Sequence, residues 1–526
     1  MGQVAQPADP VTLLLGAPWW LYVCVAGVVF TVSVLLLQGR PSRPGMATTA
    51  DLAAQLGPRR LRRRVGEIRP DLARRGWTPG STGWRLGHVG RIGRGSLWVP
   101  YDRTTLVIGP QGSGKTLDLL TPALLTAPGA ALVTLTKPQD LYLTYTARSS
   151  GDGPAVVLDS FGLVPGLPPL VWDPVAGCVD PQLAERRAKA FASGALDGTR
   201  RSSGEDASRF YAGECAKVLQ AYFHAAALAG LTLDEVLRWV ADPLRTTEPE
   251  RLLATHPDAE PYWDGLLQGA LRGDERTAAN TITTVQQAMS LFFQSGARRR
   301  CVPGPGAPAT DLRDLIRRGG TIYLLGREDP YTSAAPLMTA VAEDALDIAK
   351  RLGETSENGR LCPPFLACLD ELPSTAPIPT LLTRLANERA LGVCFIVAAQ
   401  TWRQLTATLG EHGARSLLGL ANNLVVFGGG KDGRFYQDVS DLVGQSWHRE
   451  TRYSAKGRWS PAVDRSWGDV RRPTIEAAGI RRLPERRALL LAERCPPGIV
   501  RLRRCIEGKA GRAVLGTAEA TRRRAR

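Results

Sequence analysis

Short apolar runs recur along the chain, and they lack the apolar–polar alternation of a strand with one solvated face. Runs of this length, rich in Val, Leu and Ile, are typical of parallel strands that are buried on both faces. Longer helical stretches separate them, so the pattern predicts an α/β fold built on a parallel sheet. The runs are Thr105–Ile108, Ala131–Leu135, Ala155–Leu158, Thr321–Leu325, Phe365–Leu369, Cys394–Ala399 and Leu424–Phe427.

Between Asp180 and Arg300 the apolar runs give way to amphipathic helical stretches, for example Arg209–Leu228 and Asn280–Gln294. This region has the size of a domain and separates two groups of predicted strands. We therefore expect an all-helical insertion that protrudes from the sheet. Upstream, Trp84–Val99 has the glycine and aromatic punctuation of short strands and predicts a small β-element.

The longest apolar stretch, Leu13–Leu37, has 25 positions without a charge, which is enough for a helix to cross a bilayer core of about 30 Å. No Lys or Arg precedes it, whereas a cleaved signal peptide has a basic start. The stretch thus predicts an uncleaved single-pass anchor in the cell membrane. Arg40 and Arg43 follow the anchor closely, and the positive-inside rule then places the bulk of the chain in the cytoplasm.

The composition of the 526 residues is that of an ordinary globular protein. The net charge of +16 indicates a polyanionic partner, either nucleic acid or an acidic membrane surface, and the alternative is a solvated surface that is generally rich in arginine. An arginine-rich stretch at residues 59–64 has the same two interpretations, and its closeness to the predicted anchor favours lipid. The nine cysteines include no CxxC pair, which argues against a zinc site or a disulfide framework. The basic end, Thr521–Arg526, is typical of a disordered tail.

A phosphate-binding loop is the clearest chemical motif. It follows the predicted strand Thr105–Ile108 and precedes a helical stretch, as such a loop requires. In this motif glycine N–H groups converge on phosphates, Lys115 contacts the β and γ phosphates, and the Thr116 hydroxyl binds Mg²⁺. The candidate ATP-binding residues in the loop are Gly109, Gln111, Gly112, Ser113, Gly114, Lys115 and Thr116.

Two further predicted strands end in polar residues. Asp370 and Glu371 follow Phe365–Leu369; the first carboxylate is the candidate Mg²⁺ ligand with Thr116, and the second is the candidate general base that polarises the attacking water. Gln400 follows Cys394–Ala399, where an amide can sense the γ phosphate or orient water. The alternative for Gln400 is a residue of the turn at the strand end.

Several basic and aromatic residues are weaker candidates. Arg384 and Arg389 lie between the acidic pair and Gln400 and are candidates for an arginine that acts on the γ phosphate of a neighbouring subunit. Lys137 ends the second predicted strand and is either a site residue or a surface lysine. In the helical insertion, Arg298–Arg300 are candidates for phosphate-backbone contacts, while the aromatic residues are expected in the core: Phe210, Tyr211, Phe292 and Phe293.

The order of these motifs resembles that of the type IV coupling proteins, the TraG/TraD-type ATPases of conjugation and type IV secretion. The resemblance covers most of the chain beyond the anchor. The residues that carry it are GPQGSGKT (109–116), TKPQDL (136–141), VVLDSFG (156–162), FLACLDEL (365–372), RALGVCFIVAAQTWRQL (389–405), ANNLVVFGGGKD (421–432) and GIRRLPERRALLL (479–491).

The resemblance implies a RecA-like motor domain interrupted by an all-α domain, a hexameric ring with ATP and Mg²⁺ at subunit interfaces, and transport of single-stranded DNA with its relaxase, or of protein, to a secretion channel. Two features depart from the family: one predicted span instead of two, and Thr136 in place of an Asp. The predicted division is an anchor (1–40), a basic linker (41–80), the motor domain (81–179 and 306–510), the all-α insertion (180–305) and a basic tail (511–526).

Two other functions compete with this one. A double-stranded DNA translocase of the FtsK/HerA kind shares the fold and the ring, but such motors usually carry a C-terminal winged helix, and none is evident after Arg503. A scaffold that binds nucleotide without hydrolysis does not need the second acid, Glu371.

Overall fold

The computed structural model describes residues 44–72, 76–89, 95–151, 153–199, 205–304, 306–326, 333–455 and 463–526, together with residues 23–24 and 26–27. The predicted membrane span, Leu13–Leu37, therefore lies outside the described residues except for four positions. Among the helices that the structure describes, none is long and apolar enough to cross a bilayer.

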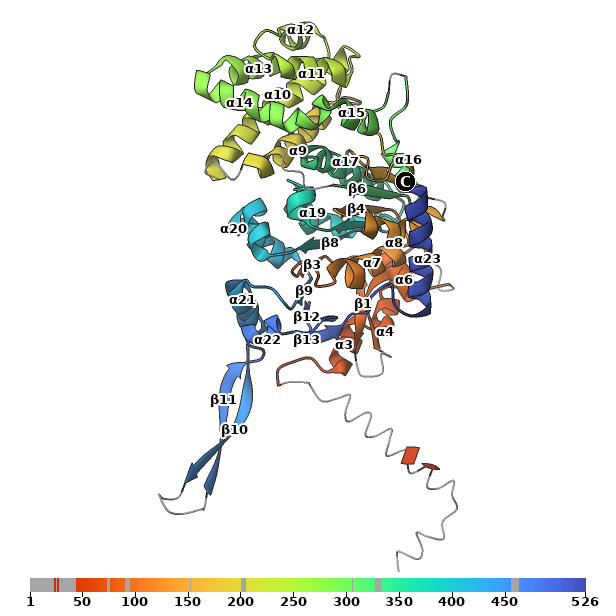
Figure 1. Ribbon diagram of the computed structural model, residues 1–526, viewed down its shortest axis with the longest axis vertical. Helices are drawn as coiled ribbons and strands as arrows, with labels where there is room; N and C mark the ends of the chain where they lie inside the picture. The colour runs from red at the N-terminus through yellow and green to blue at the C-terminus, as the bar shows by residue number, and fades with distance from the viewer. Residues whose placement is uncertain are drawn as a thin grey trace, which may run out of the picture.

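The described strands form one eleven-stranded sheet and a separate two-stranded hairpin (Figure 1). The centre of the large sheet is parallel, in the order β9-β3-β8-β7-β4-β6-β5, and these strands are buried along their whole length. The predicted α/β fold with a parallel sheet is thus confirmed. The strands are β3 Thr105–Ile108, β4 Ala131–Leu135, β5 Ala155–Leu158, β6 Thr321–Leu325, β7 Phe365–Leu369, β8 Val393–Ala399 and β9 Asn423–Phe427.

Four antiparallel strands extend the sheet beyond β9, in the order β12-β13-β1-β2. The predicted small β-element is the β1–β2 hairpin, with Trp84 opposite Val99. It joins the main sheet through β13. The bounds are β1 Gly83–Val89, β2 Gly95–Pro100, β12 Arg487–Ala492 and β13 Gly498–Arg501.

Helices cover both faces of the sheet because successive strand residues point to opposite sides: Leu106 and Ile108 belong to one apolar core, and Val107 belongs to the other. The helices on the first side are α16 Leu312–Arg317, α17 Ala335–Glu354, α18 Leu372–Thr375, α19 Leu381–Asn387, η3 Glu388–Leu391, α20 Trp402–Leu420, α21 Gly433–Val443 and α22 Ala477–Arg481. Those on the second side include α7 Thr121–Thr126 and α8 Pro138–Ser149.

Residues 41–80, predicted as a basic linker, are folded where the structure describes them. They form α3 Thr49–Leu56, α4 Pro58–Arg63, α5 Val65–Ile68 and α6 Pro79–Thr82. Single apolar side chains between the arginines explain the difference, because Leu52, Leu56, Leu61 and Ile68 are buried, and α3 and α4 pack against β2. Charged residues dominate the composition of this segment, but these four buried apolar side chains fold it against the sheet.

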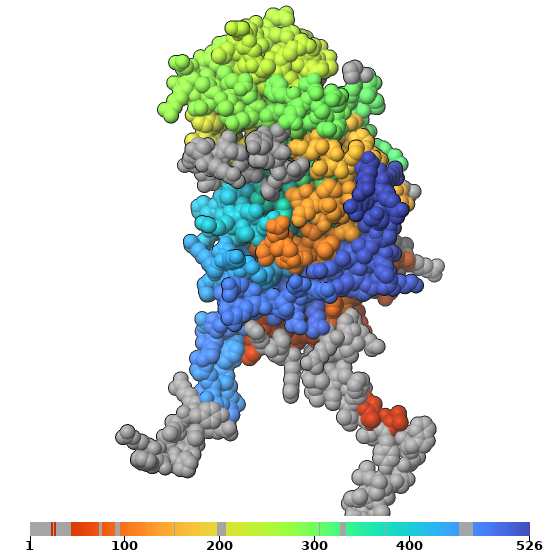
Figure 2. Space-filling model, in the orientation of Figure 1, coloured from red at the N-terminus to blue at the C-terminus, as the bar shows by residue number. Residues whose placement is uncertain are grey.

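A bundle of helices stands at the opposite end of the molecule from α3 and α4 (Figures 1 and 2). Its first helix, α9, packs against α17 and so connects it to the sheet. Phe292 is buried as expected, but Phe210 and Phe293 are exposed, so the prediction that all these aromatic residues are core was wrong. The helices are α9 Pro181–Thr199, α10 Glu205–Leu228, α11 Leu233–Ala241, α12 Glu248–Thr255, α13 Trp263–Arg272, α14 Glu275–Met289, η2 Ser290–Phe293 and α15 Ser295–Cys301.

The C-terminal segment differs from the expected disordered tail. Helix α23, Gly508–Arg524, packs along α8, and Thr521 shares a hydrogen bond of 2.7 Å with Thr146. Ala525 is buried, and its carbonyl accepts from the Gly166 N–H. The basic residues of this segment thus lie on a helix that packs against α8 through small and polar side chains.

Candidate nucleotide-binding site

The phosphate-loop motif has the strand–loop–helix setting that the sequence predicts. Strand β3 ends at Ile108, and helix η1, Lys115–Leu120, begins directly after the loop. Gly112 and Gly114 have φ angles of +77° and +98°, which side chains with a Cβ rarely adopt. The loop thus has the backbone shape that only glycine permits at these two positions, and it lies at the carboxyl edge of the parallel strands, where ligands bind in such sheets.

Lys115 is buried within this loop. Its Nζ donates to the carbonyl oxygens of Gly109 at 2.6 Å and Pro110 at 3.2 Å. Burial lowers the pKa of the ammonium, and the nearby charge of Asp370 opposes that effect. The acceptors of Lys115 Nζ among the residues that the structure describes are these two neutral carbonyl oxygens. A buried cation in such surroundings is suited to binding an anion, because phosphate oxygens are stronger acceptors.

Asp370 connects the loop to the neighbouring strands. Thr116 Oγ1 donates to Asp370 Oδ2 at 2.8 Å, while the buried Oδ1 has no hydrogen-bond donor among the described residues. Burial raises the pKa of this carboxyl above its ordinary value. The Thr116 hydroxyl, one free carboxylate oxygen and no nitrogen or sulfur ligand form a donor set that fits Mg²⁺. Ser113 Oγ in the loop is also buried and has no partner within the described ranges.

Glu371 and Gln400 meet because they follow the adjacent parallel strands β7 and β8. Gln400 Nε2 donates to Glu371 Oε1 at 2.6 Å. Glu371 has φ 50° and ψ 40°, a left-handed conformation that costs a residue with a Cβ about 1–2 kcal/mol. Strain of this kind collects at functional sites, where the surrounding structure holds a side chain in one orientation. The Glu371 carboxylate is therefore oriented by both its backbone and an amide.

Three residues near the site were missed by sequence reasoning. Burial and the charge of Asp370 raise the pKa of Asp140 to about 6. Asp118 Oδ1 accepts from Arg504 Nε at 3.0 Å, while its buried Oδ2 has no partner among the described residues. Asp118 lies one helical turn after Lys115, and this spacing was the available signal. Arg504 had none, because it comes from the far end of the chain.

The other predicted basic residues have different surroundings. Lys137 is exposed at the start of α8, and its charge acts on both Lys115 and Asp140. Of the arginine cluster in the bundle, Arg298 donates to the Phe292 carbonyl and Arg300 to the Ser160 carbonyl.

Arg384, a candidate for an arginine that acts on a neighbouring subunit, lies in the interior of its own chain. Its guanidinium is buried and forms ion pairs with Glu343 at 2.6 Å and Glu388 at 2.7 Å. Two carboxylates of the same chain thus hold the Arg384 side chain, which disfavours a contact with a neighbouring subunit. Arg389, five residues further along, is exposed.

Comparisons with known proteins show which proteins the chain is similar to. Residues 364–485 match the family model described as the TraM recognition site of TraD and TraG. The chain is 24% identical over 159 residues to the coupling protein TraD of Escherichia coli K12, a match that covers 29% of this chain and 21% of TraD. The chain thus aligns with only about a fifth of that relative.

Solved structures of the conjugative coupling protein TrwB have a similar fold. The complex of TrwB with a non-hydrolysable ATP analogue has a TM-score of 0.56 at 20% identity and covers 82% of this chain and 95% of TrwB. The complex with ADP and Mg²⁺ also has a TM-score of 0.56, at 19% identity, and covers 80% and 89%. The sequence matches confirm the resemblance to the type IV coupling proteins, and the structural matches confirm the mixed α/β fold with a large parallel sheet.

Proposed function

We propose that this chain is a membrane-anchored ATPase coupling protein that moves DNA with its relaxase, or a protein substrate, toward a conjugation or type IV secretion channel. One observation carries the proposal: Lys115 and Thr116 lie beside Asp370, Glu371 and Gln400 at the carboxyl edge of the parallel sheet. The family-model match and the nucleotide complexes of TrwB support it.

The site fits ATP with Mg²⁺. The loop from Gly109 to Gly114 would surround the phosphates, and Lys115 would exchange its two carbonyl partners for phosphate oxygens. Thr116 and Asp370 would hold the cation, directly or through water, using the carboxylate oxygen that now lacks a donor. The bound Mg²⁺ supplies neutralisation of the charge that develops on the phosphates.

Glu371 is the proposed general base, which accepts a proton from the attacking water. Gln400 holds one oxygen of this carboxylate, so its role is to keep the base in one orientation and to respond to changes near the γ phosphate. Pure nucleotide binding needs neither group. Their pairing thus favours hydrolysis over a scaffold role.

Arg389 is the proposed trans-acting arginine of a homohexamer, because it is exposed whereas Arg384 is saturated. Mixed assemblies test this role. Lys115→Ala and Arg389→Ala chains are each expected to be inactive alone, and mixing them should restore hydrolysis, since a Lys115→Ala subunit can supply its arginine to a neighbour with an intact loop. If mixing restores no activity although mixed assemblies form, Arg389 does not act in trans.

The proposals for membrane attachment and for substrate contact are based on the hydropathy and the charge of the sequence. Leu13–Leu37 is the proposed anchor in the cell membrane, with the remainder in the cytoplasm. The helical bundle is the proposed contact for DNA with its relaxase or for protein, and the net charge of +16 suits DNA.

The test is ATP hydrolysis by the full chain in detergent, measured with no DNA, single-stranded DNA or duplex DNA. A shortened chain should keep α3 and α4, because their leucines are buried against the sheet. We expect DNA to stimulate hydrolysis, and a Lys115→Ala chain to lose activity under every condition. Stimulation by duplex DNA alone would favour the duplex translocase, and the absence of hydrolysis would favour the scaffold.

A further inference from the structure

The β10–β11 hairpin forms a two-stranded sheet of its own, separate from the large sheet. Strands β10, Gln445–Ala455, and β11, Val463–Pro473, pair antiparallel over eleven positions and project away from the body of the molecule (Figures 1 and 2). At about 3.3 Å per residue, the paired part is about 36 Å long. A ribbon of two strands is marginally stable in water by itself, so a partner surface is expected along it.

One face of the hairpin carries exposed tryptophan and arginine side chains. The register places Trp447 opposite Arg471, and Thr451 opposite Trp467, so the four side chains alternate on the same face with Arg449. Trp447 and Trp467 are each 64% exposed. The guanidinium of Arg471 lies 5.7 Å from the ring centre of Trp447, and that of Arg449 lies 5.9 Å from the ring centre of Trp467. We call these residues the Trp–Arg face.

The hairpin is also basic. Residues 445–473 contain 7 Lys or Arg and 3 Asp or Glu, an excess of 4 positive charges. On the opposite face, Arg472 is paired with Glu450. On the Trp–Arg face, Asp469 lies opposite Arg449, with an exposed contact of 3.7 Å. Charge complementarity therefore calls for an anionic partner, and the indole rings call for one that also accepts an apolar surface.

The base of the hairpin lies where the described chain begins after the predicted anchor. A Cβ on Gly45 would be 2.8 Å from Thr474 Oγ1 and 2.9 Å from Ser446 Cβ, so the chain at Gly45 contacts both strand ends. Six residues separate Leu37 from Pro44. Helices α3 and α4 lie at this same end of the molecule, opposite the helical bundle (Figure 1). Helix α4 also exposes four arginines there: Arg59, Arg60, Arg62 and Arg63.

We propose that the Trp–Arg face binds the anionic phospholipid headgroups of the membrane that holds the predicted anchor. The inference rests on the membrane attachment proposed above. Tryptophan collects at membrane interfaces, and arginine binds anionic headgroups. The charges exclude insertion into hydrocarbon, so the ribbon would lie in the headgroup region. Single-stranded DNA suits the face less well, because Arg449 and Arg471 already lie over the rings on which bases would stack.

Photocrosslinking from the hairpin tests the proposal. The full chain carries p-benzoylphenylalanine in place of Trp467 and is reconstituted into phosphatidylcholine vesicles, with or without phosphatidylglycerol, in the presence of single-stranded DNA. We expect a lipid adduct that requires phosphatidylglycerol. The matched control has the probe in place of Tyr262, which is 84% exposed on the helical bundle, and should give no lipid adduct.

Each other outcome overturns the proposal. An adduct with DNA identifies a nucleic-acid contact, an adduct with a second copy of the chain identifies a subunit contact, and no adduct from a chain that floats with the vesicles excludes the lipid contact. If the chain does not float with the vesicles, the result contradicts the proposed membrane anchor. Flotation therefore distinguishes failure of the anchor from failure of the lipid contact.

Removing charge tests the arginines separately. Arg449→Gln with Arg471→Gln should lower the yield of the lipid adduct by roughly tenfold. The matched control, Arg238→Gln with Arg245→Gln, removes two exposed arginines from the bundle and should leave the yield unchanged. Hydrolysis of ATP without lipid should not change in either double variant. An unchanged yield after loss of both hairpin arginines would contradict the proposal.

Discussion

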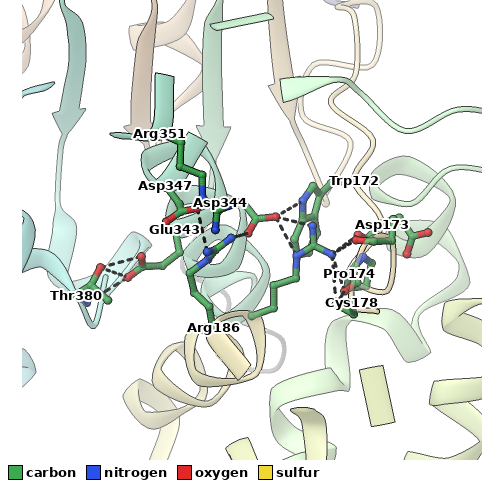
Figure 3. Close-up of polar contacts among 12 residues, drawn as sticks. Trp172, Asp173, Pro174, Cys178, Arg186, Glu343, Asp344, Asp347, Arg351 and Thr380 are labelled. Atoms are coloured by element: carbon green, nitrogen blue, oxygen red, sulfur yellow. Dashed lines mark hydrogen bonds and ion pairs between the residues drawn. The ribbon is translucent and has the colours of Figure 1, made fainter. Parts of the chain in front are cut away.

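Two buried aspartates mark two regions of this molecule that are opposite in character. Asp370, at the phosphate loop, is 8% exposed, and Asp344, in helix α17 where the bundle packs on the sheet, is 4% exposed. Asp344 Oδ2 accepts from Arg187 Nε at 2.9 Å, from Arg187 Nη2 at 2.7 Å and from Trp172 Nε1 at 3.1 Å (Figure 3). The side chain of Asp370 has one hydroxyl donor, and its other oxygen has no partner in the described part of the chain.

The surroundings repeat this difference. Around Asp344, Arg187 Nη1 also donates to backbone carbonyls, and Arg186 pairs with both Asp344 and Asp347 (Figure 3). At the phosphate loop, Ser113 Oγ and Asp118 Oδ2 are buried without partners among the described residues. Buried polar groups normally have partners, so the exceptions need an explanation. Near Asp344 the exceptions among the described residues are single atoms of side chains whose charges are paired, such as Arg186 Nε. At the phosphate loop a free oxygen belongs to Asp370, the candidate Mg²⁺ ligand itself, as a site awaiting a ligand requires. The paired charges around Asp344 instead hold two parts of the structure together.

The largest expected effect is on catalysis. Glu371→Gln should reduce kcat for ATP hydrolysis by about 10²–10⁴-fold, because it removes the proposed general base while it keeps a side chain that can pair with Gln400. Nucleotide binding and the unfolding midpoint should change little. Steady-state hydrolysis and binding of a fluorescent ATP analogue measure these effects. Hydrolysis at the wild-type rate would remove Glu371 from the mechanism.

The second prediction compares substitutions of the two aspartates, Asp344 and Asp370. Asp344→Ala leaves Arg187 buried without its carboxylate and should cost about 3–5 kcal/mol, with faster hydrogen exchange in α9 and α17. Asp370→Asn removes a partly satisfied charge, and should change the free energy of unfolding by less than about 1 kcal/mol while Mg²⁺-dependent hydrolysis is lost. If both substitutions lower the free energy of unfolding equally, the different hydrogen-bond partners of the two aspartates do not affect stability.

The ion pairs of helix α17 also show what the sequence alone does not predict. Arg384 lies between the acidic pair and Gln400 along the chain, and that position alone made it a candidate. Its partner Glu343 belongs to α17, forty-one positions earlier, so the pairing depends on tertiary packing that no local pattern contains. The seven parallel strands were predictable because each is a short apolar run that is buried on both faces. The phosphate loop and the acidic pair were predictable because their chemistry fixes residue types at short spacings.

Other elements were not predictable for different reasons. The exposed β10–β11 hairpin contains few apolar residues, so burial left no periodic trace in its sequence. Helix α23 is held by small residues and by pairs such as Thr146 with Thr521, which lie far apart in the chain. In both elements the amino-acid types resemble those of a solvated segment.

A third prediction concerns Asp118, which shares a feature with each of the two aspartates. Like Asp370, it has one paired oxygen and one without a partner among the described residues, and like Asp344 it is paired with an arginine. Arg504→Ala removes the paired donor and should weaken ATP binding by about 1.5–3 kcal/mol, because an unpaired carboxylate beneath Gly114 would disfavour the phosphates. Arg504→Lys should restore part of the loss. Titration with a fluorescent nucleotide measures both. Unchanged affinity in Arg504→Ala would show that this pair serves only to hold the C-terminal segment.

The smallest expected effect is on the pH dependence of stability through Asp140. Its pKa of about 6 in the folded chain lies above the ordinary value of 3.8, so between these values the folded state binds more protons than the unfolded state. Its contribution to stability therefore falls as the pH rises from about 4 to about 6, and the loss persists at neutral pH. Asp140→Asn removes the ionisation and should raise the thermal unfolding midpoint more at about pH 8 than at about pH 4.5, as differential scanning fluorimetry can measure. Asp347→Asn, in the region around Asp344, is the matched control and should not raise it. If Asp140→Asn raises the unfolding midpoint equally at both pH values, the substitution acts through packing. In that case the ionised Asp140 carboxylate near Asp370 does not destabilise the folded chain.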